Sequence, residues 1–430
     1  MSEQGSTITE VLQLQFADLE RQLNGSAGTA AHAVRKQAFA RVKETGLPTR
    51  KNEEYKYLAL TRELEKAFAG FVGNPELAPA DIGKVELPGL KGSEIVFVNG
   101  VYNESLSNIC EQAGVSIRIN SLEQVLPAGV TANVNDTFAG LNLALATGGV
   151  SIEVSQNTIA TEAVNIIHIT NTEKGRVFAS PRHRVTVAEN AQAVITEVFI
   201  GSGQHCSFTN SVMETSIARK GILHHYKVGL DGNHDMRVDN TTCRQQEKSV
   251  LHTVTIGYGG KIVRNNLTIR LEGEYAEANL DGLYLPTAHG TLDNHTAVDH
   301  RVPHCNSNEL YKGIIGSNAT GVFNGKVFVR EGAQKTNAFQ ANKNILLADT
   351  ATINTKPQLE IWADDVKCSH GCTTGQMDKE QLFYLRARGI DEPSARKLLL
   401  KAFAEDVIKK IADDTLRARV AAVLEEKLAS

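Results

Sequence analysis

The chain has 430 residues, 41% of them hydrophobic, and a formal net charge of −4. This length is enough for two or three domains around a large buried core. A nearly balanced, slightly acidic chain has no electrostatic footprint for nucleic acid or an anionic membrane surface, so neither partner is expected.

The N-terminal region has helical periodicity. Hydrophobic residues recur three to four positions apart from Ile8 to Leu23, and a second helix is predicted around Val34 to Val42, ending at Gly46. No basic, apolar leader precedes them, which predicts a cytoplasmic protein. We expect a helical region with its linker over residues 1–92, the linker being the stretch 75–91.

Residues 94–361 consist of short β-branched runs with little helix signal. A strand, a polar turn with a small residue and a second strand recur loosely, as in VAENAQAVI, IARKGILHHY, LEGEYAEANL and VREGAQKTN. Stacked coils of a solenoid need similar corners along one long β region. We therefore predict a mainly β fold with a β-helix core over residues 93–376.

The C-terminal region, residues 377–430, is predicted to be helical again. Asp378 is placed to cap a helix that Gly389 ends, and Asp391 is placed to cap another. A last helix is expected from Leu416 onward. These helices carry enough apolar surface to dock on a neighbouring protein or on the β-helix of the same chain, and both alternatives stay open.

The stretch DDVKCSHGCTTG places Cys368, His370 and Cys372 at alternate positions. On an extended strand these side chains share one face, and about 13 Å separates the Cα atoms of the two cysteines, at roughly 3.4 Å per residue. That separation exceeds the reach of a disulfide and of one tetrahedral metal ion. Cys368 and His370 together supply at most two metal ligands. The pattern therefore fits either an incomplete metal site or an ordinary exposed strand end.

A second histidine-rich stretch lies upstream. Its spacings match no standard zinc pattern, so we expect its members to line turns or one wall of the solenoid. The stretch contains His289, His295, His300 and His304, with Asp293, Asp299 and Cys305 among them. The four isolated cysteines, Cys110, Cys206, Cys243 and Cys305, are expected to be small buried residues. No phosphate-binding loop or nucleophile elbow is found, so neither nucleotide-driven nor acyl-transfer chemistry is predicted.

Two segments carry a family resemblance. Residues 310–390, including ADDVKCSHG, closely resemble the SufB/SufD family of iron–sulfur cluster assembly proteins, in the form of the SufD branch. The segment LPTRKNEEYKYLAL, Leu47–Leu60, is similar to another SufD element. The resemblance implies a right-handed parallel β-helix (solenoid) between N-terminal and C-terminal α-helical regions.

The resemblance also implies partners and a site. It implies a SufB-like paralogue bound through the β-helices, a SufC-like ABC-type ATPase bound to the C-terminal helices, and an indirect link to a cysteine desulfurase system. His370 and Cys368 would then lie where a nascent iron–sulfur cluster forms, as tentative metal ligands shared with the partner. The family has a small residue in place of Cys372, so no role is carried onto that thiol. The resemblance assigns no flavin site, ATP is expected only through the ATPase, and the isolated chain is free to form a homodimer.

We therefore predict a non-catalytic scaffold subunit. Two rival hypotheses come from other classes. A β-helix enzyme acting on polysaccharide would need paired carboxylates on one face of the solenoid, and the acidic residues here are scattered. A self-contained zinc protein would need further ligands from elsewhere in the chain.

Overall fold

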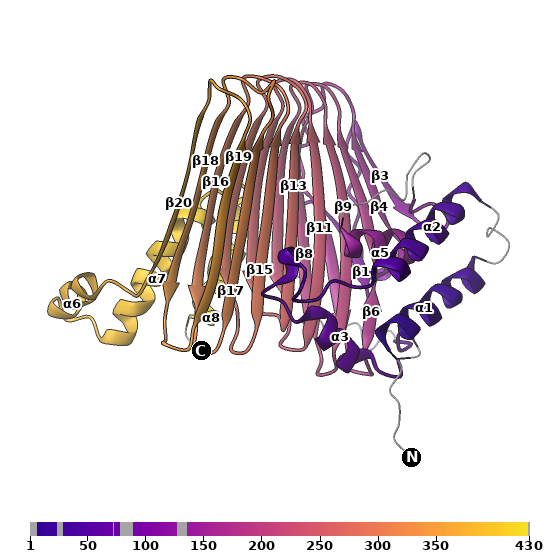
Figure 1. Cartoon of the computed structure of the whole chain (residues 1–430), viewed down its shortest axis with the longest axis horizontal. Coiled ribbons are helices and arrows are strands. Elements are labelled where there is room, and N and C mark those ends of the chain that lie inside the picture. Colours follow the sequence, from indigo (N-terminus) through magenta and orange to yellow (C-terminus); the bar gives the residue numbers. More distant parts are fainter. Residues whose placement is uncertain (1–6, 24–28, 72, 78–88, 127–135, 429–430) are drawn as a thin grey trace, which may run out of the picture.

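The computed structural model describes residues 7–23, 29–71, 73–77, 89–126 and 136–428. Two large sheets run side by side through the centre of the molecule, with the N-terminal helices beside one end of the row of strands and the C-terminal helices near the other (Figure 1). The prediction of a mainly β, parallel solenoid with helical regions at both ends is confirmed. The predicted linker, residues 75–91, lies largely outside the described residues.

One sheet, here called sheet A, contains β1, β2, β5 and then every even-numbered strand from β8 to β20. Neighbouring strands are parallel, apart from an antiparallel β1–β2 hairpin at one edge. Their order is β2 (Val101–Tyr102), β1 (Ser93–Val98), β5 (Val164–Asn171), β8 (Gln192–Ser202), β10 (Ile222–Leu230), β12 (Val250–Tyr258), β14 (Glu277–Leu285), β16 (Asn306–Ile315), β18 (Asn337–Leu346) and β20 (Lys367–Gly375).

The facing sheet B contains β3, β4, β6 and then every odd-numbered strand from β7 to β19, so from β7 onward the chain crosses from one sheet to the other in each coil. Its order is β19 (Thr352–Ile361), β17 (Thr320–Val329), β15 (Thr291–His300), β13 (Ile262–Leu271), β11 (Asp235–Gln245), β9 (Ser207–Ile217), β7 (Arg182–Val187), β4 (Gly149–Val154) and β3 (Val115–Asn120), with β6 (Val177–Ala179) also paired to β9. The core fills the space between the two sheets, and most of its side chains are aliphatic.

The recurring corners have a common backbone conformation. At one edge of each coil, a residue other than glycine takes a positive φ: Asn157, Asn190, Lys220, Lys248, Tyr275, His304 and Lys335. Each from Asn190 onward is followed by a residue with a small or short side chain, such as Ala191, Ala276 or Cys305, all of them buried. These corners are the polar turns that the sequence predicted between strands.

The N-terminal helices cover the outer face of sheet B. They are α1 (Ile8–Gln22), α2 (Ala30–Thr45) and α3 (Leu60–Phe68), with a 3-10 turn at Glu53–Tyr55. Thr7 and Glu10 form a reciprocal capping box at the start of α1. Apolar side chains of these helices pack with outward-facing residues of sheet B, including Phe208 and Met236.

One helix within the β region was missed by the prediction. α5 (Thr137–Leu145) begins at Asp136, whose carboxylate accepts a hydrogen bond from the Ala139 N–H. It lies between the N-terminal helices and sheet B and is buried nearly all round. A short helix buried on every side has no amphipathic pattern, which explains why periodicity did not reveal it. Another 3-10 turn lies at Glu104–Leu106.

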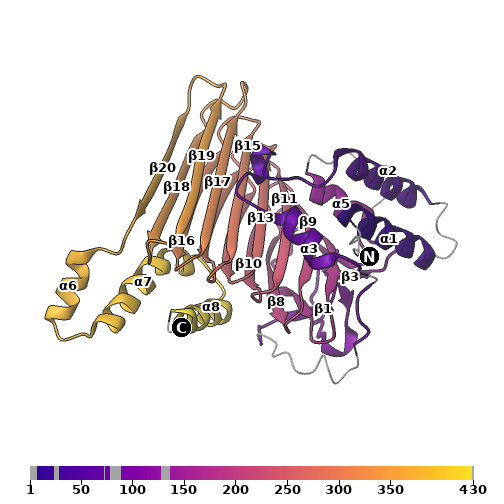
Figure 2. The same cartoon turned by 60° about the horizontal axis from the view of Figure 1, so that its bottom comes forward.

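The C-terminal helices are α6 (Lys379–Ala387), α7 (Glu392–Ile408) and α8 (Asp414–Lys427). α7 and α8 dock on the outer face of sheet A (Figure 2), with apolar residues such as Val407 and Val420 packed against the strands. The Tyr226 hydroxyl accepts a hydrogen bond from the Ala412 N–H at 2.9 Å, and Lys312 Nζ donates to Asp406 at 2.7 Å. This region therefore uses much of its apolar surface within its own chain.

Asp378 and Asp391 both cap their helices as expected. The domain boundaries at residues 92 and 376 remain a prediction. Among the described residues, no helix combines the length and the apolar character needed to cross a membrane.

Candidate functional site

Cys368, His370 and Cys372 lie on β20, the last strand of sheet A, and share one face as alternation predicted. In the parallel register they pair with Ala338, Gln340 and Asn342 of β18. Because the three β18 residues are buried, their row points into the solenoid. The cysteine and histidine side chains therefore continue three inward-facing rows of sheet A.

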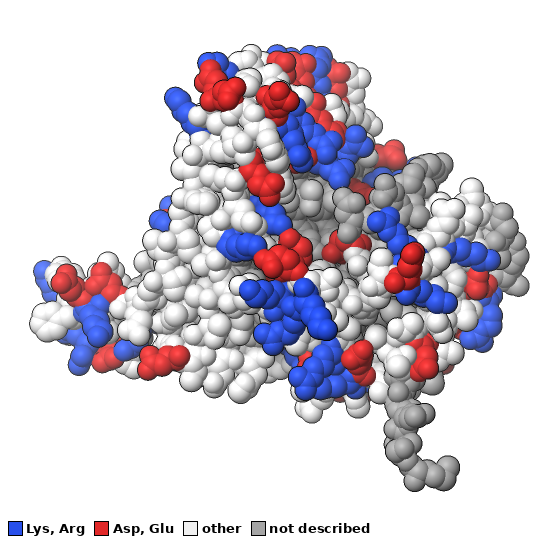
Figure 3. Space-filling model, viewed as in Figure 1, with Lys and Arg blue, Asp and Glu red and all other residues white. Residues whose placement is uncertain are grey.

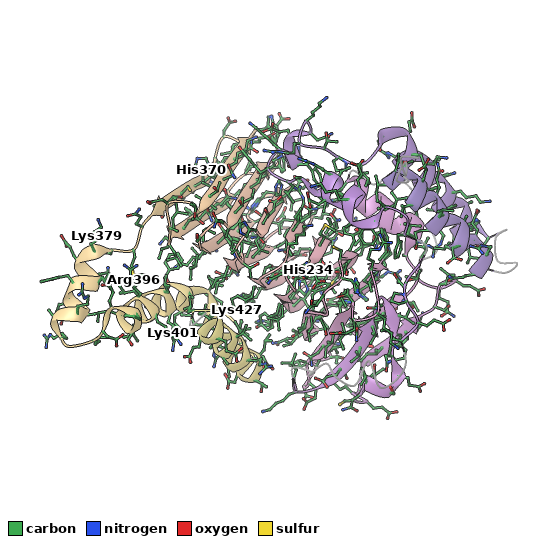
Figure 4. The ribbon with its side chains drawn as sticks, turned by 90° about the horizontal axis from the view of Figure 1, so that it is seen from below. His234, His370, Lys379, Arg396, Lys401 and Lys427 are labelled. Atoms are coloured by element: carbon green, nitrogen blue, oxygen red, sulfur yellow. The ribbon has the colours of Figure 1, made fainter. Side chains whose placement is uncertain are left out.

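These inward rows are exposed at β20 because β20 and β19 are the terminal strands of their sheets. Residues that would be covered by a further coil are open there, and His370 and Cys372 are exposed. Figure 4 shows His370 at this end of the row of strands, away from the labelled Lys401 and Lys427 of the C-terminal helices. We call the inward faces of β19 and β20 the open end of the solenoid.

The three side chains have different surroundings at the open end. Cys368 is half-buried against a small apolar cluster that includes Ala338, and burial raises the pKa of its thiol. Cys372 Sγ lies 3.3 Å from Thr355 Oγ1 on β19, so it points across toward sheet B. The His370 ring makes no hydrogen bond within the described part of the chain, which leaves its nitrogens available to an incoming ligand.

The structure bears out the interpretation of the upstream histidines. His289 and His304 occupy turns with positive φ. His295 lies on the outer face of sheet B beside Asp293, with 2.9 Å between His295 Nε2 and Asp293 Oδ1. His300 points inward, where its Nε2 lies 2.9 Å from the Ser307 hydroxyl. The solenoid thus distributes these residues over turns and both faces of a sheet and gathers no metal site from them.

All six cysteines are free. Cys243 and Cys305 are buried as expected, but Cys110 and Cys206 are only half-buried, because both lie in irregular segments next to strands. The expectation of four buried cysteines is therefore wrong for these two.

The N-terminal segment around Glu54 is held on sheet B by charge. Glu54 lies 3.4 Å from His295 and 2.5 Å from Lys326, and these contacts lower the pKa of Glu54 to about 2, with the hydrogen bond from His295 the largest cause and burial opposing it. The Arg264 guanidinium lies 4.0 Å from the centre of the Tyr55 ring. The resemblance singled out this segment, and its observed role is to fasten the N-terminal region to the solenoid.

A buried histidine cluster was missed by the prediction. The ligand atoms of His168, His183 and Glu197 lie within 4.8 Å of one another between the sheets, close to the positive charge of Lys227. The residues come from three separate strands without a local motif, so no sequence signal could have found them.

The chemistry of this cluster disfavours a metal ion. The Val150 N–H donates to His183 Nδ1, so Nε2 of the neutral ring carries the proton and offers no lone pair. Lys227 Nζ lies 3.4 Å from Glu197 Oε2 and already supplies a cation. Burial lowers the pKa of both histidines, which keeps them neutral. The cluster is better described as a buried network of polar side chains.

Comparison with known proteins identifies two matching family models. Residues 168–403 match the SUF system FeS cluster assembly, SufBD core domain, and residues 7–166 match the SufBD protein N-terminal region. The chain is 32% identical to the iron–sulfur cluster assembly protein SufD of Escherichia coli K12, over 93% of this chain and 94% of that protein. It is 30% identical to an iron–sulfur cluster assembly SufBD family protein of Synechocystis, over 87% of this chain and 86% of that one.

Proposed function

Because the chain belongs to the SufB/SufD family of iron–sulfur cluster assembly proteins, we propose that it is a non-catalytic subunit of a SufBCD-type scaffold complex. In this complex it pairs with a SufB-like paralogue and binds a SufC-like ATPase. Its own contribution to chemistry is one or two ligands for a nascent cluster, and the cluster is the product that the complex passes on.

The observation that carries this proposal is the position of His370. It lies on an exposed strand at the open end, beside Cys368, with no hydrogen bond from the described chain to occupy its ring. Two ligands from one chain leave a cluster incomplete, since iron–sulfur clusters are held by about four protein ligands. A partner at the open end would supply the others.

The surface around this end suits a protein partner. Over the last strands it carries few charged side chains, whereas Lys, Arg, Asp and Glu crowd the coil corners (Figure 3). An exposed β20 edge also offers unpaired backbone groups to another strand. We assign this edge to the SufB-like partner, which would add a strand of its own to β20.

The C-terminal helices support the second partnership. α7 and α8 are anchored on sheet A, but α6 projects beyond the strands (Figure 2) and exposes Phe383 and Tyr384, which are 73% and 58% accessible. Large apolar side chains at this level of exposure are typical of docking sites. We assign this surface to the ATPase, through which ATP hydrolysis reaches the complex.

Co-expression with a SufB-like and a SufC-like chain tests the proposal. The expected result is a stable complex of the three proteins that activates an iron–sulfur reporter enzyme in cells, and a His370→Ala complex that assembles but fails to activate it. His289→Ala, which changes an exposed turn, is the matched control. Full reporter activity of the His370→Ala complex would remove His370 from the site.

The rival hypotheses give different results with the isolated chain. A polysaccharide-processing enzyme would cleave glycans without partners, and a zinc protein would purify with stoichiometric zinc. Glycan digestion assays and elemental analysis of the purified chain separate both from the scaffold.

A further inference from the structure

Gln340 is the neighbour of His370 in a row of inward-facing side chains that runs across sheet A. Parallel pairing aligns Glu309 of β16 with Gln340 of β18, and Gln340 with His370 of β20. Gln340 is 3% exposed and Glu309 is 5% exposed. Gln340 is therefore the buried residue between the exposed histidine and an acidic group inside the solenoid.

The amide of Gln340 has a fixed orientation. Its Nε2 donates a hydrogen bond to Glu309 Oε2 at 2.7 Å. Glycine on the facing sheet makes room for it, because a Cβ atom at Gly325 would lie 2.2 Å from Gln340 Nε2. With the NH₂ group turned toward β16, the carbonyl oxygen Oε1 is left for the neighbouring strand on the other side, which is β20.

Gln340 Oε1 differs from the other inward amide oxygens of β18. Oδ1 of Asn344 accepts a hydrogen bond from the Tyr284 hydroxyl at 2.5 Å, and Oδ1 of Asn342 accepts one from Asn344 at 2.7 Å. Gln340 Oε1 is buried and has no hydrogen-bond partner among the described residues. A buried carbonyl without a partner is unfavourable and rare, so this oxygen calls for an explanation.

We propose that Gln340 is a positioning residue for His370: a rotation of the exposed imidazole ring, which makes no hydrogen bond within the described residues, brings one ring N–H to Gln340 Oε1 on the neighbouring strand. This hydrogen bond fixes the tautomer of the ring and leaves the lone pair of the other nitrogen facing the open end. Histidines that bind metals commonly donate their second N–H to a carbonyl or carboxylate in this way. Glu309 acts one step further back, by holding the Gln340 amide in its orientation.

This inference rests on the proposed function only where it predicts an effect on iron binding. The hydrogen bond requires only that the His370 ring turn toward Gln340 within the single chain, whereas its effect on iron binding requires His370 to be a cluster ligand. The two are measured separately, so failure of one does not imply failure of the other.

The first measurement is the tautomer of His370, read from the ¹⁵N shifts of both ring nitrogens in the full chain labelled at histidine. The His370→Ala spectrum identifies its signals. In the wild-type protein we expect one tautomer to predominate, and in Gln340→Met we expect both to be populated. The control is Gln358→Met, the same substitution on β19, where the side chain faces outward and the tautomer should not change.

An unchanged tautomer in a folded Gln340→Met chain would overturn the proposal. If that variant fails to fold, Gly325→Ala gives an independent test, because its new methyl group displaces the Gln340 amide without altering β18 or β20. Loss of the single tautomer is expected there too, and its retention would equally overturn the proposal.

The second measurement is cluster formation by the complex with its partner chains. Gln340→Met is expected to lower the rate about 10- to 100-fold, the usual effect of removing such a supporting group. If His370→Ala is fully active, the proposed site of cluster formation is wrong, but the tautomer result still decides the role of Gln340.

Discussion

Glu309 is a carboxyl group whose protonation is altered by its burial inside the solenoid. Burial raises its pKa to about 7 from an ordinary value of 4.5. A carboxyl group whose pKa rises on folding stabilises the fold relative to the unfolded chain only while it is protonated. Its contribution is therefore present below about pH 4.5 and is lost as the pH rises through about 7.

Glu309→Gln should consequently raise the free energy of unfolding at pH 8 by on the order of 1–3 kcal/mol and leave it nearly unchanged at pH 4.5. The new amide keeps a carbonyl oxygen that can accept the hydrogen bond from Gln340. Urea unfolding at both pH values measures the difference, and Glu331→Gln, at an exposed turn, serves as control. An equal gain at both pH values would show that the protonation of Glu309 does not control this stability.

The sequence predicted which residues of one strand share a face, but it did not predict which residues of different strands lie side by side. Alternation correctly placed Cys368, His370 and Cys372 on one face. That Gln340 and Glu309 stand behind His370 depends on which residues pair across coils, and the corners vary in spacing from one coil to the next. The buried His168–His183–Glu197 cluster was hidden for the same reason.

The corners of the solenoid are the turns at which the chain passes from one sheet to the other. Lys220 has a φ of 56°, and its backbone N–H donates to the Glu247 carbonyl of the next coil at 2.9 Å. A left-handed backbone conformation costs a side-chain-bearing residue about 1–2 kcal/mol, and glycine avoids that cost.

A β-branched side chain is disfavoured at positive φ more strongly than the unbranched lysine, so Lys220→Val should lower the free energy of unfolding by about 1–2 kcal/mol, while Lys220→Gly should leave it unchanged or raise it. Chemical denaturation of both variants tests this. Lys343→Val, on the extended strand β18, places the same side chain where it is tolerated. If valine were accepted equally at positions 220 and 343, backbone strain at the corner would not limit stability.

Helix α6 is the element for which we predict a partner. Replacing both Phe383 and Tyr384 by alanine should weaken binding of the SufC-like ATPase at least about tenfold, because large buried aromatic residues dominate interfaces. The melting temperature should not change, since both side chains are exposed in the single chain. Titration calorimetry measures the affinity, and Leu14→Ala, at an exposed position of α1, is the control.

If the double variant bound the ATPase as tightly as the wild-type chain, α6 would not be the binding surface for the ATPase.

The prediction that this region is helical needed only capping residues and periodicity. Whether its apolar face packs on the same chain was not predictable, because docking on sheet A depends on the outward rows of strands far away in the sequence. Asp136, the N-cap of α5, was the one local signal for the missed helix.

The whole molecule is a solenoid with unlike ends. The N-terminal helices cover the outer face of sheet B at one end, and the C-terminal helices cover part of sheet A, but the inward faces of β19 and β20 stay open. The sequence predicted the solenoid from its corners and strand runs. The sequence could not predict the open end, because the absence of a further coil or helix over β19 and β20 becomes visible only in the folded structure.

The iron content of the reconstituted complex tests the central claim most directly. The purified three-protein complex is incubated with ferrous iron and sulfide under anaerobic conditions, and the iron retained after desalting is measured. We predict that His370→Ala retains little iron, and that His370→Cys retains much of it, because a thiolate can replace the imidazole as a ligand. Wild-type iron content in His370→Ala would contradict a cluster site shared through His370.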